Sequence, residues 1–406
     1  MGKHLLILPL FLAALTAGCA AHPVPPPRSA PALLPANTFD GKWSTNIDPA
    51  SGPIAQIYVR EDLLFAYTAD GTSYVLSRDT GRLLHVHYLN GGLANLHPPI
   101  VFKDNIIYTA LNSLQLYDRR RGDFVRTIHL PLAVRSGATG YRNELFLGAD
   151  YPDGGRLVCL DLTREYVPTR WTLMFPGASE SSAPTVYEDV VYAAGEDGNV
   201  AAVSVDNREP AWSFGYFVTL GPVYADLQVD ETGLYVASAD TKLYCINRVS
   251  GKVKWQYFSG TALKDSPTLT KDLIFQYVPG TGLVALEKGP PVVDDPKGPF
   301  FDRQPRWIDA DATQFLAEDN QHVYVAQTDG SVAALDKTTG NPIFFTKKKG
   351  FVAFAPDATD NIVYAATDDH RVVALRPVLG TGIVGELVEV THPNTDRPQV
   401  ALTPSN

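Results

Sequence analysis

One internal repeat constrains the fold of this chain more than any other feature. A short apolar run that ends in a polar residue recurs about once every 43 residues. These polar residues are Ser77, Asp118, Asp161, Asp206, Asn247, Glu287, Asp336 and Arg376. Four strands of five to six residues with their turns need about that length, which is one blade of a β-propeller. The sequence therefore predicts an all-β fold, an eight-bladed β-propeller of four-stranded antiparallel blades.

Residues 183–216 show the four strands of one unit most clearly. They divide into the apolar runs APTVY, VVYAAG, NVAAVSV and AWSFGY. Asp197-Gly198 separates the second run from the third, and Asp-Gly between two apolar runs is a strong signal for a β-hairpin. We expect each run to form one strand.

Two recurring positions support the repeat independently. The third residue of the second strand is aromatic in every unit: Phe65, Tyr108, Phe146, Tyr192, Tyr235, Phe275, Tyr324 and Tyr364. A second position lies in the fourth run and is called the docking position here; its occupants are His85, Arg126, Trp171, Trp212, Trp255, Trp307 and Phe344. Four of the five tryptophans are in that set, so we expect it to hold the outer strand against its neighbours.

The eighth unit lacks an aromatic fourth strand after Arg376, whereas the fifth tryptophan, Trp43, precedes the first unit. We expect residues 42–47 to supply the missing outer strand, so that the N-terminal strand closes the ring and leaves no free blade edge. Residues 383–390 (IVGELVEV) are the alternative, because their alternation suits a strand although they carry no docking aromatic.

The N-terminus is typical of a secretory signal. Lys3 and His4 precede an apolar run at 5–15, which is too short to span a bilayer but suits a signal peptide. The sequence Leu-Thr-Ala-Gly-Cys that ends at Cys19 resembles the lipobox of bacterial lipoproteins, with Thr16 where that family usually has Leu. The resemblance implies lipidation of Cys19. An ordinary signal peptide with a chance cysteine remains open.

The remaining boundaries follow from composition. We predict a signal peptide at 1–18, a lipidated N-terminus and Pro/Ala-rich tether at 19–40, the propeller at 41–391 and a C-terminal tail at 392–406. A loop insertion at 288–306, rich in Pro, Gly and Asp, interrupts the sixth blade between its third and fourth strands. Ala20 stands where retention in the inner membrane requires Asp in lipoproteins, so the lipobox resemblance implies an outer-membrane anchor facing the periplasm.

The blades resemble the quinoprotein-type repeat, in which an alanine-rich third strand is followed by Thr-Gly and a Trp-bearing strand. Residues 334–345 (ALDKTTGNPIFF) and 245–257 (CINRVSGKVKWQY) are the clearest copies. The resemblance implies the propeller but not the quinone. The quinone enzymes of that family use adjacent cysteines and a Trp floor, and this chain has no Cys-Cys and places its tryptophans at docking positions. We expect no cofactor.

In size and layout the chain is similar to the BamB family of propeller lipoproteins, which belong to the outer-membrane barrel-assembly machinery. The resemblance rests on the lipobox, the tether, the eight units and residues 180–203 (ESSAPTVYEDVVYAAGEDGNVAAV). That family grips its barrel-forming partner with a Leu and an Arg just before Ser-Ala-Pro, where this chain has Ala178 and Ser179. The family's acidic partner loop also has no counterpart here. The resemblance therefore supports the fold more strongly than the identity of the partner.

No catalytic, cofactor or metal residues are predicted. Cys159 and Cys245 lie in third strands with a whole blade between them, too far apart for a disulfide. His85 and His87 share one strand face but have no third ligand at metal spacing. Asp294, Asp295, Asp302, Asp309 and Asp311 gather in or near the insertion without the pattern of a Ca²⁺ loop.

We expect Phe300 and Phe301 to be the partner-binding residues. Aromatic side chains on a long loop favour contact with a protein partner, so the insertion is predicted to be the partner-binding element. With a net charge of −10, the chain is unsuited to nucleic acid.

We therefore predict a non-enzymatic, lipid-anchored scaffold that faces the periplasm and acts as a monomer within a hetero-complex. Its partner would be another envelope protein, with the outer-membrane barrel-assembly complex as the specific version. Two alternatives remain open: an enzyme or ligand-binding sensor that uses the central channel, and a structural envelope lipoprotein with a lineage-specific partner. Carboxylates converging on the channel would favour the enzyme or sensor, and an apolar or plugged channel would disfavour it.

Overall fold

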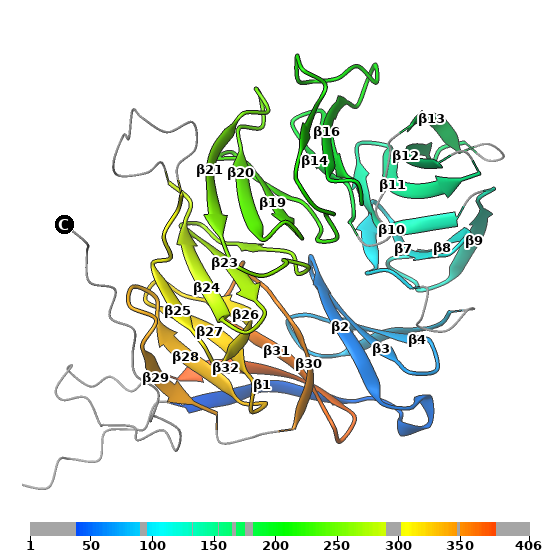
Figure 1. Ribbon diagram of the computed structural model, residues 1–406. Helices are drawn as coiled ribbons and strands as arrows, with labels where there is room; N and C mark the ends of the chain where they lie inside the picture. The colour runs from blue at the N-terminus through cyan, green and yellow to red at the C-terminus, as the bar shows by residue number, and fades with distance from the viewer. Residues whose placement is uncertain are drawn as a thin grey trace, which may run out of the picture. The chain divides into compact units, whose positions relative to one another are not determined.

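The computed structural model describes residues 38–89, 96–131, 133–152, 154–164, 168–174, 182–289, 302–346 and 350–378. Within these residues the chain forms eight antiparallel sheets of four strands each, and the sheets follow one another along the chain (Figure 1). The predicted all-β fold, an eight-bladed β-propeller, is confirmed. A single short 3₁₀ turn, Pro49–Ser51, lies between the first two strands of the described part.

The first four blades take their strands in chain order. Blade 1 comprises β2 (Ile54–Arg60), β3 (Leu63–Thr68), β4 (Thr72–Ser77) and β5 (Leu83–Tyr88). Blade 2 comprises β6 (Ile100–Phe102), β7 (Asn105–Ala110), β8 (Ser113–Asp118) and β9 (Phe124–His129). Blade 3 comprises β10 (Ala133–Tyr141), β11 (Glu144–Tyr151), β12 (Gly154–Asp161) and β13 (Thr169–Met174). Blade 4 comprises β14 (Thr185–Tyr187), β15 (Val190–Ala194), β16 (Asn199–Ser204) and β17 (Tyr216–Val218).

The last four blades differ only at the end of the chain. Blade 5 comprises β18 (Gln228–Val229), β19 (Leu234–Ser238), β20 (Lys242–Ile246) and β21 (Val253–Phe258). Blade 6 comprises β22 (Thr268–Leu269), β23 (Leu273–Val278), β24 (Gly282–Glu287) and β25 (Trp307–Asp309). Blade 7 comprises β26 (Ala312–Glu318), β27 (His322–Gln327), β28 (Val332–Asp336) and β29 (Pro342–Phe345). Blade 8 comprises β30 (Phe351–Ala355), β31 (Val363–Thr367), β32 (Arg371–Val378) and β1 (Thr38–Asn46).

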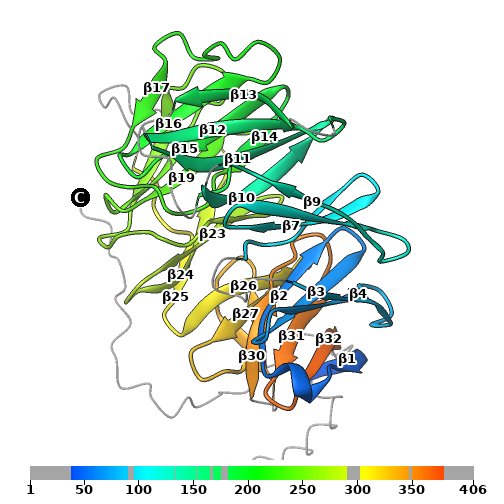
Figure 2. The same ribbon diagram turned by 90° about the vertical axis from the view of Figure 1, so that its right-hand side faces the viewer.

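The N-terminal strand closes the ring, as predicted. β1 pairs antiparallel with β32 from Thr38↔Val378 to Asn46↔Arg371, with a bulge between Gly41 and Trp43. Both views show blue β1 beside orange β32 (Figures 1 and 2). The alternative closing segment, 383–390, lies outside the described residues. Because blade 8 combines the two ends of the described chain, its hydrogen bonds hold the ring shut.

The hydrophobic core is divided among the blade interfaces. Each of eight buried clusters joins two consecutive blades, and one of them joins blade 8 to blade 1. The aromatic residues of the second strands fill these clusters, and all eight are at most 1% exposed. Each blade therefore buries its faces by stacking on its two neighbours.

The docking position explains the repeated Trp and the repeated turn glycine together. The indole Nε1 of Trp212 donates to the carbonyl oxygen of Arg248 in the next blade at 3.0 Å. Gly251, at φ +71°, lies under the same ring, and a Cβ there would come within 2.6 Å of Trp212. The turn therefore needs glycine both for its backbone conformation and for the space that the ring occupies.

The same contact recurs with other residues. Trp43 donates to the carbonyl of Arg78, and Trp307 to that of Lys337, both at 3.0 Å. His85 reaches the carbonyl of Arg119 at 3.1 Å through Nε2, and Arg126 donates to that of Leu162 at 2.8 Å. The prediction that His85 replaces Trp at a docking position is confirmed.

Blade 4 departs from the expected strand. The run 211–216 was predicted to be the fourth strand, but β17 begins only at Tyr216. The preceding residues turn, with Gly215 at φ +87°, and Pro210 at their start has no backbone N–H to give to a ladder. Trp212 reaches its docking site from this turn rather than from a strand.

The polar residue at the end of several third strands organises the turn that follows it. The side chain of Asp336 accepts from the backbone N–H of Thr338 and Thr339, and that of Asn247 accepts from Val249 and Ser250. These turns place the next residue beside the preceding blade, where a cation is often found. Ion pairs of this kind, each between neighbouring blades, are Arg119–Glu61 at 2.7 Å, Arg248–Glu188 at 2.6 Å and Lys288–Asp230 at 2.5 Å.

Candidate functional site

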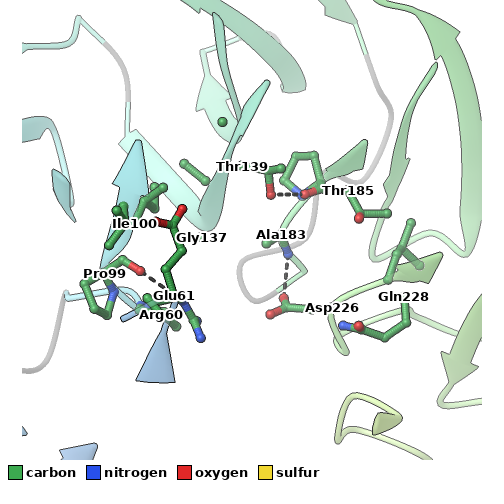
Figure 3. Close-up of a pocket in the computed structure, with 16 residues that line it drawn as sticks. Arg60, Glu61, Pro99, Ile100, Gly137, Thr139, Ala183, Thr185, Asp226 and Gln228 are labelled. Atoms are coloured by element: carbon green, nitrogen blue, oxygen red, sulfur yellow. Dashed lines mark hydrogen bonds between the residues drawn. The ribbon is translucent and has the colours of Figure 1, made fainter. Parts of the chain in front are cut away.

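A cavity lies among the innermost strands of blades 1 to 5. Its volume is about 350 Å³, at the small end of the range for ligand sites. The main chain of its wall comes from the first strand of each blade or from the residues just before it, so the cavity belongs to the central channel (Figure 3). Its lining combines small residues and prolines with a few polar groups: Arg60, Glu61, Pro98, Pro99, Gly137, Ala138, Thr139, Gly140, Ala183, Pro184, Thr185, Asp226 and Gln228, with Ile100, Val101 and Leu227.

Hydrogen bonds between blades fix the main chain of this wall. The Ala183 N–H donates to the Asp226 carboxylate at 2.6 Å, and the Asp226 N–H donates to Ser266 Oγ at 2.8 Å. On the other side of Ala183, the Thr139 hydroxyl donates to the Pro184 carbonyl at 2.5 Å. These contacts bind four consecutive blades together around the channel, which makes the cavity a preformed feature of the ring.

Arg60 and Asp226 are the charged groups on opposite sides of the cavity (Figure 3). Arg60 donates through Nε to the Pro99 carbonyl at 3.2 Å and through Nη1 to the Val59 carbonyl at 2.9 Å. Burial lowers the pKa of Arg60 and raises the pKa of Asp226, because each charge is partly removed from water. Among the described residues neither group forms a salt bridge, whereas Glu61 pairs with Arg119 at 2.7 Å.

The root of the insertion is fixed against blade 5. On the outgoing side, Lys288 is buried, pairs with Asp230 at 2.5 Å and donates to the Thr270 carbonyl. On the returning side, the Arg303 N–H donates to the Gln256 carbonyl at 2.6 Å. The guanidinium of Arg303 also lies 4.9 Å from the centre of the Trp255 ring, within the range of a cation–π contact. Both ends of the loop are therefore anchored.

Several residues singled out in the sequence fall outside the described residues. These are Cys19, Phe300 and Phe301, together with Ala178, Ser179, Asp294 and Asp295. The lipid attachment and the contact role of the insertion therefore stay predictions. Of the insertion, residues 288–289 and 302–306 are described.

The cysteines and histidines of the blades have structural surroundings. Cys159 and Cys245 are free and buried in different blades, and burial raises the pKa of each thiol to about 12. His87 is buried, and its Nδ1 lies 2.8 Å from the Tyr108 hydroxyl, while burial lowers its pKa to about 4. Its ring stacks on His85 with a centroid separation of 5.8 Å. Both histidines thus pack as core aromatics.

The described residues contain neither a metal cluster nor a membrane-spanning helix. No three or more His, Cys, Asp or Glu side chains in that part of the chain are grouped so that they could hold a metal ion. Asp302 instead accepts from the side-chain amide of Gln256 at 2.8 Å. In the same residues no helix is long and apolar enough to span a membrane.

The sequence reasoning did not find Arg60 and Asp226. A usable signal exists in the register of the first strands. Pro98, Gly137 and Ala183 each lie four residues before the last residue of a first strand, and Asp226 lies three before the end of β18. A carboxylate among small residues and proline is conspicuous once those positions are aligned. The opposing Arg60 has no such signal, because only the ring places it across the channel.

Comparison with known proteins gives the same fold and one matching family. The family model of the outer membrane protein assembly factor BamB matches residues 304–381. The crystal structure of BamB from Moraxella catarrhalis has a TM-score of 0.63 and 16% identity, and the match covers 84% of this chain and 98% of that one. No curated protein sequence matches significantly.

Other solved structures share the architecture without that name. The computationally designed Ika8 protein matches with a TM-score of 0.61 and 15% identity, over 82% of this chain and 98% of that one. The C-terminal WD40 domain of Sif2 matches with a TM-score of 0.59 and 11% identity, over 84% and 99%. At these identities the structural likeness establishes the fold alone.

Proposed function

We propose that this chain, a BamB-like propeller of quinoprotein-type repeats, is a non-enzymatic scaffold for outer-membrane β-barrel assembly. The observation that carries the proposal is the family match over residues 304–381, which spans β25 of blade 6, all of blade 7 and β30–β32 of blade 8. The eight closed blades support it, since the Moraxella catarrhalis protein has the same fold over nearly its whole length. The partner would be an envelope protein of that assembly complex.

We place the scaffold on the periplasmic side of the outer membrane, attached through lipid on Cys19. Several acyl chains bury enough methylene groups, at about 0.8 kcal/mol each, to make such an anchor stable. The test is to label cells of the host with radioactive palmitate and compare the wild type with Cys19→Ser. We expect label and membrane association in the wild type and loss of both in the variant; a labelled variant would contradict the assignment.

The insertion is our proposed partner-binding element, with Phe300 and Phe301 as its contact residues. Its support is the described root: Lys288–Asp230 and Arg303–Trp255 hold both ends to blade 5. A loop with fixed ends loses less conformational entropy on binding than a free one, which favours its use as a contact. The blade core does not need the loop, because β24 and β25 pair on their own from Leu283↔Asp309 to Ala285↔Trp307.

The experiment is capture from native membranes in mild detergent through a C-terminal tag, followed by mass spectrometry. We would compare the wild type, a variant with 290–301 replaced by a Gly/Ser linker, and the double variant Phe300→Ser, Phe301→Ser. Phe124→Ser is the matched control, because Phe124 is 58% exposed on β9 of blade 2 and is far along the ring.

We expect the barrel-forming subunit with the wild type and with Phe124→Ser, and its loss by about tenfold in the other two. Absence of that subunit from the wild-type sample would overturn the assembly role. Equal recovery with all variants would retain the role but remove the insertion from it.

A further inference from the structure

Arg60 and Asp226 line the central cavity, and neither forms a salt bridge within the described residues. Arg60 Nη2 has no hydrogen bond within the described residues, and the carboxylate of Asp226 accepts one, from the Ala183 N–H. The third charged lining residue, Glu61, is neutralised by Arg119 at 2.7 Å. The cavity therefore offers one positive and one negative site with no excess of either charge.

We propose that this cavity binds a small zwitterion of about dipeptide size, with its carboxylate on Arg60 and its ammonium group on Asp226. The inference is independent of the assembly role. It concerns a different part of the ring from the insertion, and it assigns a ligand rather than a protein partner.

The charges favour a zwitterion over a simple anion or cation. A simple anion would be attracted by Arg60 but repelled by Asp226 across the same small space. A simple cation would be attracted by Asp226 but repelled by Arg60. A ligand with both groups satisfies both walls, and charge-assisted hydrogen bonds of this kind are stronger than neutral ones. Burial disfavours the charged form of each group, and a ligand group of opposite charge beside it would offset that cost.

The size follows from the walls. Small residues let the first strands of blades 3 and 4 approach closely in this wall, because a Cβ on Gly137 would lie 3.2 Å from the Ala183 methyl group. Pro98, Pro99 and Pro184 stiffen the surrounding backbone, which keeps the cavity open without a ligand. At about 350 Å³ it suits a dipeptide, and the polar side chains of Thr185 and Gln228 are available to peptide groups.

The test is calorimetric titration of the purified full chain with three probes. L-alanyl-L-alanine carries both charges, its N-acetyl derivative carries only the carboxylate, and its C-terminal amide carries only the ammonium group. The variants are Arg60→Gln and Asp226→Asn, the second of which keeps an oxygen for the Ala183 N–H. Glu188→Gln is the control, because Glu188 is likewise paired, with Arg248 at 2.6 Å, but does not line the cavity. Thermal melts would establish that each variant is folded.

We expect the wild type and Glu188→Gln to bind the dipeptide equally, and each blocked derivative to bind at least about tenfold more weakly. Asp226→Asn should weaken binding of the dipeptide and its amide but not of the N-acetyl derivative. Arg60→Gln should weaken binding of the dipeptide and its N-acetyl derivative but not of the amide. No binding of the dipeptide at millimolar concentration would overturn the proposal. So would equal affinity for capped and uncapped probes, or binding that neither variant alters. Capture of the barrel-forming subunit should be unchanged in both variants, and its loss would identify the cavity as a protein contact instead.

Discussion

The interface between blades 4 and 5 and the interface between blades 5 and 6 present the same residue, tryptophan, at the docking position. In the first, Trp212 donates to the Arg248 carbonyl at 3.0 Å and its ring lies on Gly251. In the second, Trp255 is fully buried, but its Nε1 has no hydrogen-bond partner among the described residues. The turn that should receive it is interrupted by the insertion after Lys288.

At the second interface, contacts of two cations stand in place of the hydrogen bond and the glycine contact of the repeated turn. Arg303 covers the Trp255 ring at 4.9 Å, and Lys288 forms a buried pair with Asp230. The corresponding pair of the first interface, Arg248–Glu188, is more open, because the Glu188 side chain is 63% exposed. At the second interface, contacts of Lys288 and Arg303 with blade 5 thus accompany the insertion into the repeat.

The largest effect should come from removing the buried cation. We expect Lys288→Ala to lower the free energy of unfolding by about 3 kcal/mol, because Asp230 is left buried without its partner. The matched change Arg248→Ala should cost at most about 1 kcal/mol, since its partner is in water. Urea unfolding of both proteins measures the difference. Equal costs would mean that the two interfaces do not differ in this way.

The two glycines should differ next. Gly251→Ala places a Cβ within 2.6 Å of Trp212 at φ +71°, so we expect a cost of about 2 kcal/mol from strain and overpacking. At Gly289, just after Lys288, an added Cβ would meet no atom of the described residues within 4 Å beyond its chain neighbours. Gly289→Ala should therefore change stability by less than about 0.5 kcal/mol. Thermal unfolding measures both. A comparable loss at Gly289 would show that the insertion root is as tightly packed as the repeated turn.

Replacing each tryptophan by phenylalanine isolates the hydrogen bond. Trp212→Phe loses a bond and leaves the Arg248 carbonyl without that donor, whereas Trp255→Phe loses no bond to the described residues. We expect Trp212→Phe to cost about 1 kcal/mol more than Trp255→Phe. Chemical denaturation of both variants measures it, and a larger loss at Trp255 would reverse the comparison.

The smallest effect should appear on acidification. Burial of Asp230 opposes its ionisation, but hydrogen bonds from Lys288 and Thr232 outweigh it, so its pKa lies below the ordinary value. A lowered carboxyl pKa stabilises the fold above the unfolded-state pKa, and this contribution disappears as the pH falls through the folded-state pKa. Stability measured from about pH 5 to about pH 2 should therefore fall less steeply in Asp230→Asn than in the wild type. Parallel profiles would exclude this contribution.

The sequence predicts the blades well because the residues that specify one blade lie close together along the chain. The docking residues and the second-strand aromatics recur at one spacing. Trp43 alone indicates which end of the chain completes blade 8. Trp212 shows where the pattern is insufficient, because the turn at Gly215 moves β17 toward the C-terminus while the ring still reaches its site.

The sites are less predictable because they depend on neighbours in space. Arg119, Arg248 and Lys288 all follow the end of a third strand, yet their acidic partners lie in the preceding blade. Arg60 and Asp226 belong to blades 1 and 5, and nothing local connects them. The cavity wall carries Arg60 and two carboxylates, Asp226 and Glu61, and of these Glu61 pairs with Arg119.

The most direct test of the proposed scaffold role is photo-crosslinking from the insertion in intact cells of the host. A benzoylphenylalanine would be placed at position 300 and, as the control, at position 124 on β9. We predict that illumination links position 300, but not position 124, to the barrel-forming subunit of the outer-membrane assembly complex. Crosslinks from position 300 only to other proteins, or equal crosslinks from both positions, would contradict the account.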